Sequence, residues 1–205
     1  MVPADLSRSG WCCNSQNPDD SRCVIEGTPH RSSEIRGVLV RLPSVLATDL
    51  PHIVVSDREY VASEMTAFMV YWLNALGKPV LNRPTPRSLL GPGWFPEHWI
   101  YYAAQAGMRV RSMSRAIRLT WFDQPAWPEH KGSFAELTVL AGVRCFGDVA
   151  PSLAAKARAL AAAARVDLVK FLFDGPDSNA CFLAADLCPP LDNGGIEQTV
   201  LDYFG

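Results

Sequence analysis

The fold is indicated most clearly by a short stretch that reads Pro79-Val80-Leu81-Asn82-Arg83-Pro84. Its apolar residues lie between two prolines, which favours a short strand that ends near Asn82. An earlier apolar run over residues 35–41 predicts a buried strand. Between the two runs, apolar residues recur at helical spacing from about residue 58 to residue 76. This strand–helix–strand order predicts a βαβ unit with a parallel strand pair.

The rest of the chain alternates helices and strands, and prolines and glycines mark their ends. We expect three parts: a polar, loosely ordered leader over residues 1–32, an α/β half over residues 33–114 and an α+β half over residues 115–205. The two halves are expected to share one core. The further expected helices cover residues 96–106, 151–165 and 196–204, and the further strands cover residues 22–26, 108–113, 137–146, 167–173 and 181–186.

Composition restricts the class of protein. Hydrophobic residues make up 48% of the 205 residues and charged residues 20%, which is ordinary globular usage and argues against disorder. The formal net charge is −2, so the chain has no long-range attraction for nucleic acid or an acidic membrane. A group of arginines is interpreted as a solvated face rather than a binding patch. They are Arg109, Arg111, Arg115 and Arg118.

No stretch is long and apolar enough to be a membrane span, and the N-terminus has no apolar core of a secretion signal. We therefore expect a cytoplasmic protein, in which disulfides are rare. Cys12, Cys13 and Cys23 cluster near the N-terminus, and with His30 they form a candidate zinc site, although no C-x-x-C pair is present. The other cysteines stand in apolar surroundings and are expected to be small core residues. They are Cys145, Cys181 and Cys188.

Three blocks follow one another in a characteristic order. The first is Gly37-Val38-Leu39-Val40-Arg41, and the second is the Asn-Arg-Pro stretch quoted above with the helix that ends Ala103-Ala104-Gln105-Ala106-Gly107. The third is Phe182-Leu183-Ala184-Ala185-Asp186-Leu187-Cys188-Pro189-Pro190. This arrangement resembles the ATP-grasp superfamily, especially RimK-like carboxylate–amine ligases, over about residues 35–113 and 137–204. The resemblance implies an α/β fold with a small parallel-rich sheet, flanking helices and a C-terminal α+β portion of ATP-grasp type.

The resemblance also implies a reaction in which a carboxylate becomes an acyl phosphate and an amine then displaces the phosphate. Such chemistry needs cations for the nucleotide phosphates, carboxylates for Mg²⁺ and a glycine-rich flap that excludes water. Only residues 108–136 stand where the family has its long nucleotide-binding segment, so the chain resembles a truncated, degenerate member. Lys131, in Lys131-Gly132-Ser133, is a faint equivalent of the flap. Lys131 and Arg83 are the nucleotide-binding candidates if the chain is active.

The metal-binding motif of the family is altered here. Its Glu is replaced by Ala184, which cannot coordinate Mg²⁺, and its Asn is replaced by Asp186. Asp186 and either Asp174 or Asp167 are therefore the metal-binding candidates of an active enzyme. Acids that face water at turns and strand ends are the simpler interpretation.

Aromatic residues form the candidate binding surface, because Trp and Tyr combine apolar area with polar tips. The residues are Trp94, Trp99, Trp121 and Trp127. Packing of the second helix onto the sheet is the simpler interpretation of those in or near that helix.

Three functions stay open. The first is a non-catalytic, ATP-grasp-like accessory subunit that binds a peptide, a protein or a small carboxylate. The second is a compact ligase that uses Mg-ATP, and the third is a metal-binding protein that uses the N-terminal cysteines.

Overall fold

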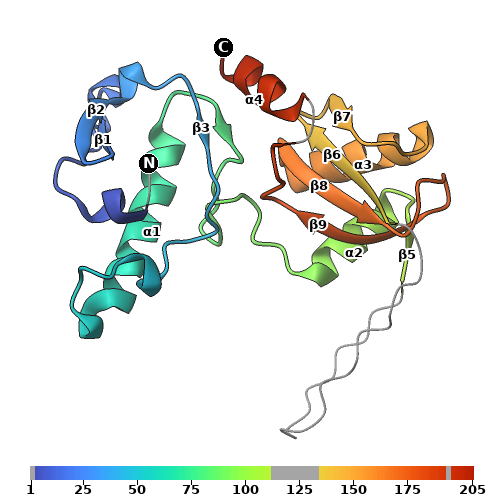
Figure 1. Ribbon diagram of the computed structural model, residues 1–205, viewed down its shortest axis with the longest axis horizontal. Coiled ribbons are helices and arrows are strands. Elements are labelled where there is room, and N and C mark those ends of the chain that lie inside the picture. The colour runs from blue at the N-terminus through green and yellow to red at the C-terminus, as the bar shows by residue number, and fades with distance from the viewer. Residues whose placement is uncertain (1–2, 112–133, 193–194) are drawn as a thin grey trace, which may run out of the picture. The chain divides into compact units, whose positions relative to one another are not determined.

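The computed structural model describes residues 3–111, 134–192 and 195–205. These residues form two compact units (Figure 1). The first unit runs up to Gly93 and adds Ala164–Leu168 and Leu187–Gly205. The second comprises the described residues of Trp94–Ala163 and Val169–Asp186. The C-terminal residues thus return to the unit that contains the N-terminal half.

The first unit contains a β-hairpin, a parallel strand pair and two helices, and the second contains a mixed sheet and two helices. No helix among the described residues is long and apolar enough to span a membrane. The helices are α1 (Arg58–Ala75), α2 (Pro96–Gln105), α3 (Pro151–Ala164) and α4 (Ile196–Phe204). The strands are β1 (Arg22–Ile25), β2 (Thr28–Arg31), β3 (Val38–Leu39), β4 (Val80–Leu81), β5 (Arg109–Val110), β6 (Ala135–Leu140), β7 (Arg144–Phe146), β8 (Leu168–Phe173) and β9 (Cys181–Asp186).

The predicted βαβ unit is present in the first unit. Strands β3 and β4 are parallel, with Val38 opposite Val80 and Leu39 opposite Leu81. Helix α1 connects them and buries Met69, Trp72 and Leu73 at helical spacing. Burying side chains of this size contributes roughly 1.5–3 kcal/mol each, so this apolar stripe is a main source of stability for the unit.

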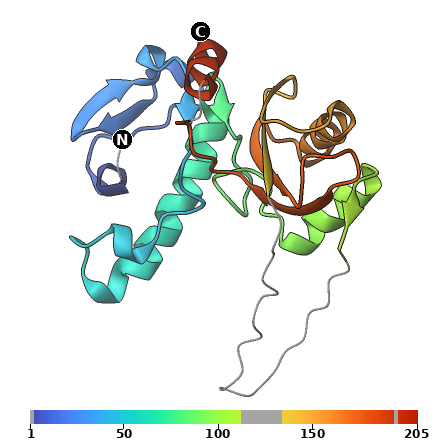
Figure 2. The ribbon, with the colours of Figure 1, turned by 45° about the vertical axis from the view of Figure 1, so that its right-hand side comes forward.

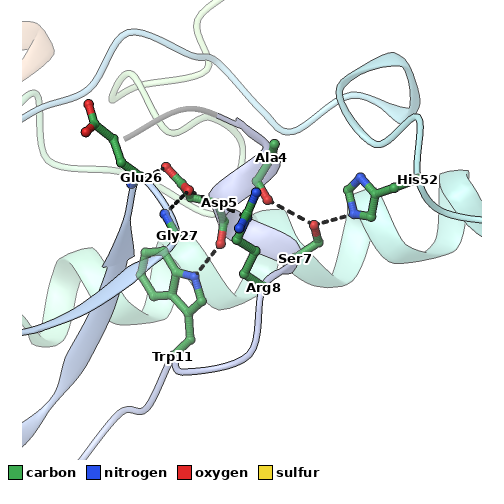
Figure 3. A network of polar contacts seen from close by, with 8 residues as sticks. All are labelled: Ala4, Asp5, Ser7, Arg8, Trp11, Glu26, Gly27 and His52. Atoms are coloured by element: carbon green, nitrogen blue, oxygen red, sulfur yellow. Dashed lines mark hydrogen bonds and ion pairs between the residues drawn. The ribbon is translucent and has the colours of Figure 1, made fainter.

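An aspartate near the N-terminus fixes the β1–β2 hairpin (Figure 3). Asp5 is 2% exposed, and its carboxylate accepts hydrogen bonds from the backbone N–H groups of Glu26 and Gly27, at 3.1 and 2.9 Å. Glu26 and Gly27 have φ values of 51° and 78°, which a two-residue hairpin turn requires. The indole N–H of Trp11 donates to the backbone carbonyl of Asp5 at 2.8 Å. The polar leader is therefore a packed hairpin, because a buried carboxylate satisfies the backbone of its turn.

The second unit is built on a sheet with the strand order β5-β9-β8-β6-β7. Strands β8 and β9 form the expected antiparallel hairpin, and β5 runs parallel to β9. Helices α2 and α3 both cover the same face of this sheet (Figures 1 and 2). Phe171, Phe173 and Phe182 are almost fully buried and form the centre of this core. The ring of Phe182 lies edge to face with those of Phe171 and Phe173, with centroids 6.2 and 6.4 Å apart.

One predicted strand is two strands in the structure. Residues 137–146 were expected to be continuous, but β6 ends at Leu140 and β7 begins at Arg144 as its antiparallel partner. Ala141 and Gly142 both adopt left-handed backbone angles, with φ of 51° and 67°. The chain reverses there because these two residues form the tight turn, a signal that the surrounding apolar run conceals.

Candidate functional site

The carboxyl ends of β3 and β4 lie at the same edge of the parallel pair and carry polar residues. Ligands of α/β sheets bind outside the carboxyl ends of parallel strands. Arg41 follows β3, and its guanidinium donates to the backbone carbonyl of Pro189. The thiol of Cys188 lies 3.6 Å from the backbone carbonyl of Arg41. The segment after β9 therefore covers the end of β3 within the first unit.

Asn82, directly after β4, is a structural residue in this edge. It is 2% exposed, and its side-chain N–H donates to the carbonyl of Leu168 at 2.7 Å. Its side-chain oxygen accepts from the backbone N–H groups of Asp167 and Leu168, at 2.9 and 2.7 Å. The Asn of the Asn-Arg-Pro stretch thus holds the backbone of Asp167 and Leu168, which belong to the same unit.

Arg83, the nucleotide-binding candidate, is exposed and lies near Asp167 and Tyr203. Burial raises the pKa of Tyr203 above 10.0, and the neighbouring Asp167 carboxylate raises it further, both by its charge and by accepting a hydrogen bond from the hydroxyl. The charge of Arg83 acts in the opposite direction. Asp167, one of the metal-binding candidates, is therefore a hydrogen-bond partner of Tyr203 in this structure. Lys131, the other nucleotide-binding candidate, lies outside the described residues.

The two acids expected to share a metal ion lie at opposite ends of the β8–β9 hairpin. Asp186 stands opposite Lys170 in the register, whereas the backbone N–H of Asp174 donates to the carbonyl of Cys181 at the other end. The five steps from Cys181 to Asp186 span about 16 Å at about 3.3 Å per residue. Magnesium–oxygen bonds are only about 2.1 Å long. One ion cannot contact both acids, which corrects the expected pairing of Asp174 with Asp186.

Asp174 has a local structural role instead. Its carboxylate accepts a hydrogen bond from the backbone N–H of Cys181 at 2.7 Å and lies 3.6 Å from the Arg111 guanidinium. It therefore closes the turn between β8 and β9 and pairs with a cation next to β5. Of the arginines interpreted as a solvated face, Arg109 and Arg111 are exposed, and Arg115 and Arg118 lie outside the described residues.

A second ion pair lies on the sheet surface and was not anticipated from the sequence. The ammonium of Lys170 lies 3.1 Å from the Glu136 carboxylate, across β8 and β6. Lys170 also stands opposite Asp186, so two acids flank one lysine on this surface. Only the strand register reveals this group, because its members are far apart in the sequence.

The aromatic candidates are partly core residues. Trp99 is only 6% exposed, with its ring 6.1 Å from Phe171, so it packs α2 onto the sheet and cannot offer a binding surface. Trp94 is half-buried and stacks on Tyr102 with centroids 4.4 Å apart and planes 10° apart. Trp121 and Trp127 lie outside the described residues.

The N-terminal cysteines do not form a metal site with His30. Cys23 is fully buried, and burial raises the pKa of its thiol, which disfavours the thiolate that binds metal. His30 lies 3.2 Å from the Glu34 carboxylate. No group of three or more His, Cys, Asp or Glu side chains that could hold a metal ion occurs within residues 3–111, 134–192 and 195–205. The zinc site expected from Cys12, Cys13 and Cys23 is therefore not assembled.

Two hollows lie in the first unit. The larger, of about 770 Å³, lies beside α1 and is lined by Ser63, Thr66 and the acidic Glu59, which disfavours a carboxylate ligand. The smaller, of about 320 Å³, runs along β3. We name it the β3 groove, and its walls are strongly apolar. Lining residues include Leu6, Ile25, Val38, Met69, Trp72 and Leu73.

Comparison with known proteins supports the fold. No family model matches the sequence, and no curated protein sequence matches it. Among solved structures, the crystal structure of macrocyclase MdnB from Microcystis aeruginosa MRC matches with a TM-score of 0.56, over 88% of this chain and 72% of that one. The two sequences are 12% identical, so this likeness shows the fold alone. The chain therefore has the expected α/β fold and shares it with this macrocyclase.

Proposed function

We propose that this chain is a reduced relative of RimK-like ligases that binds a peptide or protein partner and does not itself catalyse ligation. The observation that carries the proposal is the separation of Asp174 and Asp186 by the length of β9. Together with Ala184 in place of the metal-binding Glu, it leaves the β8–β9 hairpin with one carboxylate, Asp186, at the position where the resemblance puts the ion. A single carboxylate on an exposed strand end holds Mg²⁺ weakly.

A peptide is the favoured ligand for two reasons. The solved structure that shares this fold is that of a macrocyclase, an enzyme that forms a ring, and we extend a flexible, chain-like ligand to this protein. The β3 groove also offers a long apolar surface rather than a compact polar site. A small carboxylate fits less well, because Glu59 lines the larger hollow.

One observation favours a second candidate, a compact ligase that uses Mg-ATP. Lys170, Glu136 and Asp186 share one surface of the sheet, and a lysine next to two carboxylates can serve phosphate and metal binding together. In this alternative, Asp186 would hold the ion.

Phosphate release by the purified full chain distinguishes the two. The assay contains ATP, Mg²⁺ and a mixture of amino acids and short peptides. We expect release at the rate of the protein-free control. Sustained release that disappears in Asp186→Ala, while the variant keeps its circular dichroism spectrum, would contradict a non-catalytic role and support the ligase.

A further inference from the structure

The β3 groove has a floor and two walls. Met69, Trp72 and Leu73 of α1 form the floor. One wall is β3 with its flanking residues, and the other is made by Leu6 and Ile25 of the N-terminal hairpin region. The hydrogen bonds of Asp5 hold that second wall in place, since they fix the turn that follows Ile25 (Figure 3). Its volume of about 320 Å³ is at the lower end of ligand pockets, which are about 300–1,000 Å³.

The wall formed by β3 is an unpaired strand edge. The backbone N–H groups of Val38 and Val40 donate to the carbonyls of Pro79 and Leu81, at 3.0 and 2.8 Å. Because alternate residues of a strand direct their backbone groups to opposite edges, the N–H and C=O of Leu39 point away from β4. Among the described residues, no strand pairs with that second edge of β3. Leu39 therefore offers one donor and one acceptor to a further strand.

The floor of the groove contains an unpaired donor. The indole N–H of Trp72 has no hydrogen-bond partner among the described residues, although Trp72 is only 1% exposed. Buried donors are almost always paired, and leaving one unpaired costs free energy. The Trp72 ring lies edge to face with that of Trp11, with centroids 5.3 Å apart, so this indole belongs to the core beneath the groove.

The side chains of β3 are less buried than their apolar character leads us to expect. Gly-Val-Leu-Val is a continuous apolar run of the kind that fills strands buried on both faces. Val38, Leu39 and Val40 are nevertheless only half-buried. The predicted buried strand is therefore only half-buried in the chain alone, and an apolar partner in the groove would complete its burial.

We propose that the outer edge of β3 accepts an extended, apolar peptide segment as an added strand, whose backbone pairs with Leu39. This inference rests on the proposed function and names its site. Such strand addition obtains affinity from backbone pairing and specificity from side-chain pockets. Arg41 is exposed and lines the same groove, so a carboxylate next to the apolar part of the peptide is favoured.

The test uses the full chain as bait for a phage-displayed library of random 12-residue peptides, followed by synthesis of the enriched peptides. We expect enriched sequences with alternate apolar residues and a neighbouring Asp or Glu. Two variants of one position form the decisive pair. Leu39→Ala keeps the backbone donor, whereas Leu39→Pro removes it without removing a β3–β4 hydrogen bond, since proline is tolerated where an edge N–H is unpaired.

The peptide should bind Leu39→Pro at least about tenfold more weakly than it binds Leu39→Ala. Melting curves show which variants fold.

If Leu39→Pro does not fold, hydrogen exchange on the unmodified chain takes the place of the comparison of variants. The bound peptide should then protect the Leu39 amide from exchange. Equal affinities, or an unprotected Leu39 amide, would overturn the site and leave the proposed function intact. Failure to enrich any peptide would overturn both. A chain that elutes as a dimer through this edge, and as a monomer after Leu39→Pro, would identify a second copy as the occupant and overturn the peptide.

Discussion

The side-chain amide of Asn82 holds the backbone of Leu168 through both of its polar ends. Its nitrogen donates to the Leu168 carbonyl and its oxygen accepts from the Leu168 N–H, each at 2.7 Å. A further bond comes from the Asp167 N–H at 2.9 Å. In most sheets such backbone groups pair with a neighbouring strand, whereas here the N–H and C=O of Leu168 pair with a single side chain. We therefore expect the stability of the first unit to depend on Asn82.

Replacing Asn82 with alanine should destabilise the protein strongly. The change removes three hydrogen bonds and leaves the buried backbone groups of Leu168 and the partly buried N–H of Asp167 without this partner, which costs roughly 3 kcal/mol in total. Urea unfolding followed by tryptophan fluorescence measures the loss. Asn74→Ala is the matched control, because Asn74 is exposed and should lose less than about 1 kcal/mol. Equal losses in the two variants would show that Asn82 has no special structural role.

The C-terminal helix should depend on the absence of a side chain at Gly37. A Cβ atom added to Gly37 would overlap the ring of Phe204 at the end of α4. Gly37→Ala should therefore cost about 1–3 kcal/mol by overpacking, whereas Gly77→Ala, with nothing within 4 Å of the added atom, should be close to neutral. The cost of Gly37→Ala should fall in a Phe204→Ala background, as a double-mutant cycle by urea unfolding would measure. Full additivity would contradict the contact.

Alkaline pH should destabilise the protein partly through Tyr203. Burial first, and then the charge of Asp167, raise the pKa of Tyr203 above 10.0, so the folded chain keeps this proton longer than the unfolded chain. The stability that this group contributes is therefore complete below about pH 10 and is lost as the pH rises through the folded-state pKa. Burial raises the pKa of the Cys23, Cys145 and Cys181 thiols in the same direction, starting from 9.0.

The difference between two variants isolates the tyrosine. Tyr203→Phe should lose less stability between pH 9 and pH 11 than the unmodified chain, measured by urea midpoints at each pH. Tyr71→Phe, at a residue that is 52% exposed, should follow the unmodified chain. Parallel profiles for all three proteins would show that Tyr203 does not titrate abnormally.

Asp174 and Asp186 should differ in their effect on stability. Asp174→Ala removes the hydrogen bond to the Cys181 N–H and the ion pair with Arg111, and should cost about 1–2 kcal/mol. Asp186 is exposed at the end of β9, and Asp186→Ala should stay within about 0.5 kcal/mol of the unmodified chain. Thermal melting of both variants checks this order, and the reverse order would contradict the structural role of Asp174.

Local periodicity was sufficient for much of the fold. The spacing of Met69, Trp72 and Leu73 predicted α1, and the apolar runs on either side of it predicted the parallel pair β3–β4. Proline at the start of α2 and α3 marked their first turns. These signals act over a few residues, so the sequence contains them directly.

The errors have a common cause, since they depend on contacts between distant residues. The polar leader packs because Asp5 pairs with a turn 21 residues later. Asp174 and Asp186 are separated by the register of β8 and β9, which the sequence does not specify. The unpaired indole of Trp72 becomes visible only when its surroundings are known. The altered motif at Ala184, by contrast, could be read from the sequence alone.

Thermal unfolding with and without millimolar Mg-ATP tests the central claim, partner binding without ligation, most directly. A ligand that binds only the folded state at about 100 times its Kd adds roughly 2.7 kcal/mol of stability, or about 5 °C or more in Tm. The account predicts that Mg-ATP changes the Tm by less than about 1 °C. A rise of about 5 °C that Asp186→Ala abolishes would show that a nucleotide site survives, and it would contradict the account.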